Sequence, residues 1–413
     1  MPASSPTPRR RRTPAALAAG AALATATLVV ALPAPALADG PGTGTPTVVT
    51  VGDSYISGEA GRWAGNTNTG SQYVDALGST AYYDNASNTA ETIPRCHRSH
   101  AAEVHLGGGV NGMNLACSGA KTATYTDPNG YFKPGLDFYD NGAGNQGQAT
   151  MLQAYASSHN VTMVAVSIGG NDFNFGSIVQ SCVSDFLTSS SLWPNYCNDD
   201  SSVTANFTSS NVSARTTAIK NALLNVATAM RNAGYADSQW TLMVQDYMSP
   251  LPGGSGIRYS QSGYTRQNTG GCGFWNKDAD WANSTALSTI NSSVKNAVSA
   301  TGLSNTRVLE LATAFNSRRL CENTVGLLEE EGLSSWTGTG AVDKTEWVNQ
   351  IRTVSTATSD YYIQESLHPN YWGELALRSC LRQAYNGGAP KSGTCTRGST
   401  GLTASGEPVM SLK

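Results

Sequence analysis

Short apolar runs alternate along the chain with longer stretches in which apolar residues recur at helical spacing. The runs are rich in aliphatic side chains, which favours buried strands. They lie at residues 48–51, 164–168, 240–245 and 307–311. Strands that alternate with helices indicate a parallel sheet covered on both faces. We therefore expect an α/β fold, a flavodoxin-like three-layer α/β/α sandwich with a parallel sheet of about five strands.

The helical stretches carry start and stop signals. In residues 219–230 the apolar side chains share one face, with Ser213 as the expected N-cap and Gly234 just beyond the end. The same spacing recurs at residues 287–298, and a last helix is expected at about 373–385. These helices provide the two outer layers of the predicted sandwich.

The strand at 48–51 runs directly into Gly52-Asp53-Ser54. A glycine and an acid at the end of a strand favour a tight turn, which would present the Ser54 hydroxyl at the edge of the sheet. A serine hydroxyl is a poor nucleophile without a base, and its attack on a carbonyl also needs donors for the oxyanion. Ser54 is therefore a candidate nucleophile if such groups lie near it.

Two later segments supply those groups. The run at 164–168 ends in Gly169-Gly170-Asn171-Asp172, and His368 is an isolated histidine near the C-terminus. In open α/β sheets ligands bind at the carboxyl ends of the strands. The turns that carry Ser54 and Asn171 can therefore face one crevice, which His368 would reach on the loop before the last helix.

On these residues the chain resembles the SGNH (GDSL) hydrolases, most closely the secreted actinobacterial lipases and phospholipases among them. Four sequence blocks carry the resemblance in the family's order. They are Gly52-Asp53-Ser54, Ala116-Cys117-Ser118-Gly119-Ala120, Gly169-Gly170-Asn171-Asp172, and His368 with its preceding acid. The resemblance implies the SGNH type of α/β fold and a serine ester hydrolase.

The resemblance also implies roles for individual residues. Ser54 would be the nucleophile and His368 the base, while the backbone N–H groups of Ser54 and Gly119 and the side-chain amide of Asn171 would hold the oxyanion. Most members have an aspartate three residues before the histidine, where this chain has Glu365. Some relatives instead use a backbone carbonyl just before the histidine. Both partners for His368 remain open at this point.

Ser118 is an alternative nucleophile, because residues 116–120 are a degenerate form of the G-x-S-x-G turn. Ser54 is preferred because it follows the better strand and because Cys117 is expected in a disulfide. Asp53 and Asp172 are interpreted as acids that stabilise turns.

We expect no metal and no cofactor. Cys96, His97, His100 and His105 lie close together in sequence but lack the paired spacing of structural zinc sites. We interpret them as part of a disulfide-tied loop with exposed histidines. The motif G-x-G-x-x-G at 107–112 is not followed by a convincing helix, which argues against a dinucleotide site.

The first residues have the pattern of a secretory signal. Arg9 to Arg12 precede a charge-free run that ends in Ala36-Leu37-Ala38, so we expect a signal peptide at residues 1–38 and cleavage before Asp39. A membrane anchor is the alternative, since the run is long enough for one. The run is rich in alanine and only weakly apolar, which favours the signal peptide. The protein is therefore expected to be secreted and extracellular.

Removing residues 1–38 takes away four of the 26 basic residues and no acid, so 22 basic residues face 29 acidic ones, a net charge of −7. Such a chain has no electrostatic footprint for nucleic acid, and contact with a membrane or micelle surface would be transient, apolar and local. Residues 39–413 are expected to form a single SGNH hydrolase domain, monomeric, with long loop insertions. The tail after Cys395 is expected to be polar and poorly ordered.

Eight cysteines in an exported chain indicate disulfides. Counting alone allows 105 connectivities. The family resemblance favours pairing neighbours, which leaves the last two cysteines for each other. The expected pairs are Cys96–Cys117, Cys182–Cys197, Cys272–Cys321 and Cys380–Cys395.

The blocks identify the chemistry and leave the substrate open. We expect an enzyme that releases fatty acids from phospholipids or other acyl esters through an acyl-enzyme on Ser54. One alternative is a carbohydrate esterase that removes acetyl or aryl-acyl groups from plant polymers. Another is a non-catalytic binding protein on a hydrolase fold, against which the presence of Ser54, Asn171 and His368 counts.

Overall fold

The computed structural model describes residues 40–353 and 363–413, which belong to one compact unit. The expected signal peptide, residues 1–38, lies outside the described residues. Within the two described ranges, no helix combines the length and the apolar character that crossing a bilayer requires.

The centre of the fold is a seven-stranded sheet with the order β2-β1-β5-β6-β7-β8-β9. All neighbours pair in parallel except β8 and β9, which are antiparallel. The strands in this order are Asn111–Asn114, Thr47–Gly52, Val161–Ser167, Thr241–Gln245, Thr306–Glu310, Gly393–Leu402 and Pro408–Leu412. A separate two-stranded sheet joins β3 (Tyr125–Thr126) to β4 (Phe132–Lys133). The expected α/β fold with a parallel sheet is confirmed.

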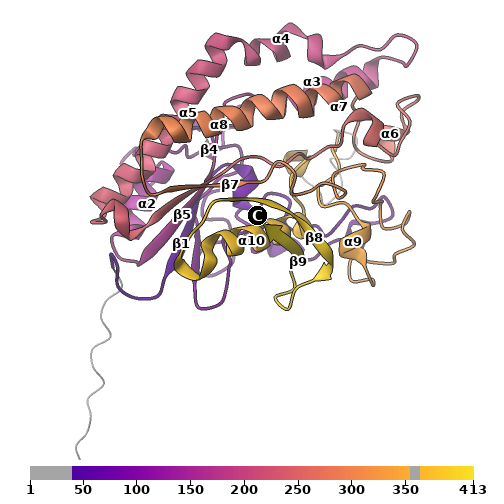
Figure 1. Cartoon of the computed structure of the whole chain (residues 1–413). Coiled ribbons are helices and arrows are strands. Elements are labelled where there is room, and N and C mark those ends of the chain that lie inside the picture. The colour runs from indigo at the N-terminus through magenta and orange to yellow at the C-terminus, as the bar shows by residue number, and fades with distance from the viewer. Residues whose placement is uncertain (1–39, 354–362) are drawn as a thin grey trace, which may run out of the picture. The chain divides into compact units, whose positions relative to one another are not determined.

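Helices cover both faces of this sheet. Figure 1 shows α5 and α8 on one side of the strands and α10 on the other. Every residue of β1 is buried, as a strand covered on both faces requires. The helices are α1 Ser54–Ser57, α2 Gln148–Ala156, α3 Phe175–Thr188, α4 Ser201–Thr204, α5 Ser209–Asn232, α6 Thr265–Asn268, α7 Asn276–Trp281, α8 Ser288–Thr301, α9 Ala341–Lys344 and α10 Tyr371–Tyr385. A π-helical segment, Ala282–Leu287, joins α7 to α8.

The first long helix begins earlier than its apolar pattern indicates. The Thr208 side chain accepts a hydrogen bond from the backbone N–H of Asn211 and caps α5, so the expectation of Ser213 as N-cap was wrong. The first turn of α5 is polar and exposed, and an apolar pattern cannot detect such a turn. Gly234 lies just beyond the helix with a φ of 98°, in the role expected of it.

The C-terminal segment departs from its expectation. The tail was expected to be poorly ordered, but β8 and β9 form a hairpin at the edge of the sheet. The Cys380–Cys395 disulfide ties β8 to α10, and Glu407 binds Arg382 of that helix. The seven strands therefore exceed the expected five partly because this hairpin extends the sheet.

All four expected cysteine pairs are confirmed as disulfides. The pair Cys96–Cys117 joins the long insertion after β1 to the loop after β2. The pair Cys182–Cys197 fixes the segment that follows α3, and Cys272–Cys321 joins two further loops. The bridges thus brace loops more than they brace the sheet.

Two buried carboxyl groups lie between the sheet and α10. Glu103 and Glu374 are both inaccessible to solvent, and the Gln245 amide donates to Glu103 at 2.8 Å. Burial raises the pKa of Glu103 to about 8, and burial together with the nearby Glu103 raises the pKa of Glu374 well above its usual value. Burial therefore favours the protonated form of both groups.

Glu103→Gln is expected to stabilise the protein at neutral pH. The folded pKa of Glu103 lies above the ordinary value of 4.5, so its contribution to stability falls as the pH rises between these two values. An amide keeps the contact with Gln245 and removes this loss, which should raise the free energy of unfolding at pH 7 by on the order of 1–3 kcal/mol. Urea unfolding at about pH 4 and pH 7 measures the effect, which should vanish at the lower pH.

Glu331→Gln, a change at a partly exposed carboxylate, is the matched control and should leave the stability unchanged at both pH values. A Glu103→Gln protein that is less stable than wild type at pH 7 would contradict the prediction.

Candidate active site

Ser54 is the first residue of α1 and follows β1 after a turn that requires glycine. Gly52 has a φ of 135°, and a Cβ there would lie 1.9 Å from the backbone oxygen of Ser167 on β5. Asp53 caps the short helix by accepting a hydrogen bond from the backbone N–H of Tyr55. The turn therefore fixes the Ser54 hydroxyl at the carboxyl end of β1, as the sequence pattern predicts.

His368 reaches Ser54 from the loop before α10. Its Nε2 lies 2.7 Å from Ser54 Oγ, and its Nδ1 lies 2.9 Å from the backbone oxygen of Ser366. A proton on Nδ1 donates to that carbonyl and leaves Nε2 to accept from the serine. Burial lowers the pKa of His368, although the negative charge of Glu59 opposes this effect. The environment of His368 therefore favours the neutral imidazole, the form that can accept a proton from Ser54.

Glu365 is not the group that orients His368. Its carboxylate accepts hydrogen bonds from the Trp63 indole at 2.8 Å and from the Tyr82 hydroxyl, and it is buried. The Ser366 carbonyl occupies the place at Nδ1 that an acid would otherwise take. Of the two partners that the sequence left open, the geometry supports the backbone carbonyl. Glu365 instead anchors the loop that carries the histidine.

The three candidate oxyanion donors lie around the same space. In the part of the chain that the structure describes, the backbone N–H groups of Ser54 and Gly119 make no hydrogen bond. Gly119 has a φ of 81°, and the loop that carries it is fixed by the disulfide of Cys117. Asn171 donates one amide hydrogen to the Ala120 carbonyl at 3.0 Å, which leaves the other for a ligand. Ser54, Gly119 and Asn171 line one cavity.

Ser118, Asp53 and Asp172 each make hydrogen bonds to neighbouring side chains or backbone. Ser118 is buried, and its hydroxyl accepts a hydrogen bond from Gln364 at 2.8 Å, with no imidazole bound to it in the described ranges. The Asp53 carboxylate binds the Tyr247 hydroxyl besides capping α1, and Asp172 accepts from the backbone and hydroxyl of Thr122. The turn-stabilising interpretation agrees with the cap that Asp53 makes, whereas the contacts of Asp172 join its turn to the loop at Thr122.

The expectation that His97 is exposed was wrong. Its side chain is only 1% exposed and its Nδ1 lies 2.7 Å from Glu59. Burial opposes the charged form of each, yet their attraction raises the pKa of His97 and lowers that of Glu59 to about 2. The two side chains therefore form a buried ion pair.

The zinc alternative fails on the same geometry. Cys96 is bridged to Cys117, and no group of three or more potential metal ligands gathers anywhere in residues 40–353 and 363–413. The G-x-G-x-x-G segment leads into strand β2 and not into a helix.

Gln364 joins this ion pair to the catalytic loops, a role that the sequence did not suggest. Its amide nitrogen lies 2.9 Å from Glu59, 2.8 Å from Ser118 and 3.1 Å from the backbone oxygen of Arg95. Ser118 precedes the candidate oxyanion donor Gly119, and Gln364 lies four residues before His368. One side chain thus ties the oxyanion loop and the histidine loop to the same buried carboxylate.

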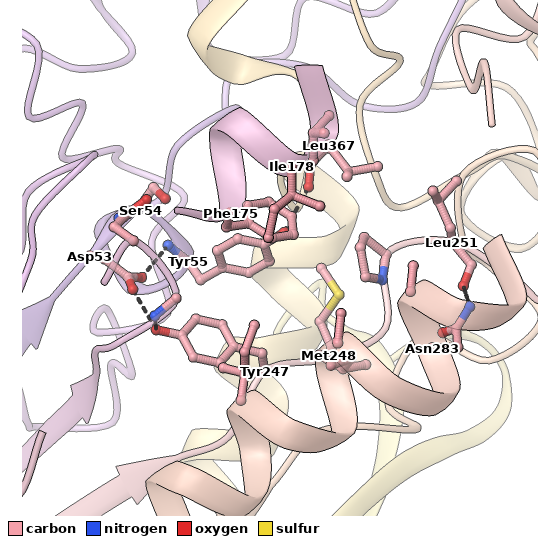
Figure 2. A pocket seen from close by; sticks show the side chains of 18 of the residues that line it. Asp53, Ser54, Tyr55, Phe175, Ile178, Tyr247, Met248, Leu251, Asn283 and Leu367 are labelled. Carbon is pink, nitrogen blue, oxygen red and sulfur yellow. Dashed lines mark hydrogen bonds between the residues drawn. The ribbon is translucent and has the colours of Figure 1, made fainter. Parts of the chain in front are cut away.

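Two apolar spaces meet at the nucleophile. The wider is a cavity of about 600 Å³, and the narrower is a slot of about 70 Å³. Ser54, Asn171, Phe175 and Val179 line both. Figure 2 shows the slot, with Ser54 and Asp53 at one end, Leu251 and Asn283 at the other, and Tyr55, Phe175, Tyr247 and Met248 between them. An extended apolar group bound at Ser54 therefore has two directions in which to lie.

Comparisons with known proteins give the following. No protein-family model matches the chain, and no curated relative matches it. Among solved structures, an extracellular lipase from Streptomyces rimosus has 18% identity and a TM-score of 0.44, with 83% of this chain and 100% of the lipase covered. Phospholipase A1 from Streptomyces albidoflavus has 17% identity and a TM-score of 0.43, with coverage of 82% and 99%.

A carbohydrate acetylesterase from Sinorhizobium meliloti is also similar, at 12% identity and a TM-score of 0.28, with coverage of 64% of this chain and 83% of the other. Since all three TM-scores lie below 0.5 and all identities below 25%, these likenesses carry no argument about the chemistry of this chain.

Gln364→Ala is expected to lower kcat while the protein stays folded. Loss of the amide frees the two loops from Glu59, and small displacements of catalytic groups are costly, so we expect roughly a tenfold or larger loss in kcat with KM changed by less than about twofold. Steady-state kinetics on a soluble p-nitrophenyl ester measures this split.

Gln153→Ala is the matched control, because Gln153 is a partly exposed residue of α2 that lines neither space at Ser54 and whose side chain accepts from Asn232 at 3.0 Å. Its kinetics should equal those of wild type. An unchanged kcat in Gln364→Ala, at an unchanged unfolding midpoint, would show that the amide does not position the catalytic groups.

Proposed function

We propose that this protein is a serine ester hydrolase that releases fatty acids from phospholipids. The observation that carries the proposal is the Ser54–His368 pair at 2.7 Å, set where two apolar spaces meet. The pair supplies an activated nucleophile, and the apolar spaces suit the long acyl chain of a lipid better than an acetyl group on a sugar.

The reaction follows from the contacts. Ser54 Oγ attacks the ester carbonyl carbon while His368 Nε2 takes its proton. The negative oxygen that forms is held by the N–H groups of Ser54 and Gly119 and by the free amide hydrogen of Asn171, each such donor being worth on the order of 10²–10³ in rate. The protonated histidine then gives its proton to the departing alkoxide, and water repeats the cycle on the acyl-enzyme.

The cellular setting belongs to the same proposal. Four disulfides are typical of proteins that fold in an oxidising environment, and they agree with the signal peptide that the first 38 residues predict. The enzyme would then act outside the cell on lipid that it meets there.

Wild-type protein is expected to release fatty acid from phosphatidylcholine that carries two distinguishable acyl chains, and Ser54→Ala is expected to release none. The identity of the fatty acid gives the position that is cleaved. Cleavage of a short p-nitrophenyl ester and of acetylated xylan, without release from lipid, would contradict the lipid substrate and favour the carbohydrate esterase. Absence of all cleavage, with no labelling of Ser54 by an active-site phosphonate, would contradict ester hydrolysis itself.

Ala286→Phe is expected to shorten the acyl chain that the enzyme prefers. Ala286 is buried in the π-helical segment and lines the slot, so a phenyl ring there fills part of the space. We expect kcat/KM for long-chain p-nitrophenyl esters to fall by roughly 10-fold or more, with butyrate unchanged.

Ser284→Phe places the same ring on the exposed side of that segment and serves as the control. Its chain-length profile should match that of wild type. A parallel loss on short and long esters in Ala286→Phe would indicate general damage and not a filled slot.

A further inference from the structure

Two large apolar side chains project from the segment that follows α3. Leu192 is 82% exposed and Trp193 is 84% exposed, the highest values among the large exposed apolar residues of the described chain. Such residues rarely stay in water without a reason when they are adjacent on one turn. We refer to Leu192 and Trp193 as the apolar tip.

The apolar tip sits on a braced turn. The backbone N–H of Trp193 donates to Ser190 at 2.9 Å and closes the turn. At its base, Asn195 donates to the Ser189 hydroxyl and to the Asp185 carboxylate, and the Cys182–Cys197 disulfide closes the whole segment. Little conformational entropy is therefore lost when the tip inserts into another phase.

The turn follows closely in the chain after a helix that lines the cavity at Ser54. Helix α3 lines that cavity from Phe175 at its first turn to Leu187 and Thr188 at its end. Leu192 follows Thr188 by only four residues, which is at most about 15 Å of chain. The apolar tip therefore lies close to the last residues of α3 that line the cavity, and a surface that receives the tip lies close to the cavity as well.

The charged residues around the base of the turn indicate which kind of lipid surface the apolar tip can bind. Asp185, Asp199 and Asp200 surround it, and Lys277 is paired with Asp199 at 3.3 Å and lies over the Tyr196 ring. An acidic neighbourhood repels anionic lipid, whereas an indole suits the boundary between head groups and acyl chains. The partner that fits is a zwitterionic or neutral lipid surface.

We propose that Leu192 and Trp193 insert into a zwitterionic phospholipid surface and hold the cavity mouth against it. The proposal rests on the proposed function, because it places the surface that carries the substrate beside the cavity. Docking here depends on burial of the two apolar side chains and not on attraction between charges.

Binding can be measured apart from catalysis. Ser54→Ala protein, which leaves the lipid intact, is centrifuged with vesicles of pure phosphatidylcholine, alone and with Leu192→Ser, Trp193→Ser or both changes added. We expect each change to weaken binding by roughly fivefold to tenfold, and the pair by on the order of 50-fold. Leu402→Ser, at a 46% exposed leucine of the C-terminal hairpin, is the matched control and should bind as the parent does.

Charge dependence gives a second, independent readout. Adding salt should leave binding to phosphatidylcholine vesicles unchanged, and adding anionic phosphatidylglycerol to the vesicles should weaken it or leave it unchanged. A strong increase in binding with phosphatidylglycerol would overturn the assignment, because attraction to basic residues elsewhere would then hold the protein.

The same changes are then made in the protein that retains Ser54. Cleavage of soluble p-nitrophenyl butyrate should be unaffected, while release from vesicles falls with binding. Equal binding in all variants overturns the proposal, and so does an equal loss on the soluble ester, which would place the tip in the catalytic cavity's own function. Tip-dependent binding without any lipid cleavage supports the docking surface and overturns the phospholipase assignment alone.

Discussion

The buried ion pair of Glu59 and His97 is the interaction on which the active-site loops depend. Two charges taken out of water are costly to bury, and each is tolerable only beside the other. Glu59 also accepts a hydrogen bond from Gln364, a residue of the loop that carries His368. The same Gln364 amide donates to Ser118, the residue before Gly119. His368 and the candidate oxyanion donor Gly119 are thereby positioned against one buried carboxylate, which lies five residues beyond Ser54.

A second layer of contacts surrounds this pair. Tyr82 stacks on the His97 ring with 4.4 Å between the ring centroids and binds Glu365 through its hydroxyl. On the far side of the site, the hydroxyl of Tyr55, next to the nucleophile, donates to the Leu367 carbonyl, next to the base, at 2.9 Å. The catalytic serine and histidine are therefore joined by their neighbours as well as by their own hydrogen bond.

The sequence predicted those parts of the site that follow directly from local pattern. Ser54 and Asn171 could be placed because each ends an apolar run, and parallel strands bring such ends to one edge of the sheet. His97, Glu59 and Gln364 could not be placed, because an isolated polar residue in a loop or turn is interpreted as exposed until its distant partner is known. The expectations of Ser213 as N-cap and of a poorly ordered C-terminal tail were wrong for a related reason, since a polar first turn of a helix and a polar strand such as β8 both lack an apolar period.

The partner of His368 has a consequence for how the site responds to acid. A carboxylate that orients an imidazole can itself be protonated, so in acid it loses its charge and its hold on the ring together. The backbone oxygen of Ser366 binds no proton at any pH that a protein survives. The hydrogen bond at Nδ1 therefore does not depend on the protonation of a side-chain acid, and in acid this contact responds only to protonation of the imidazole itself.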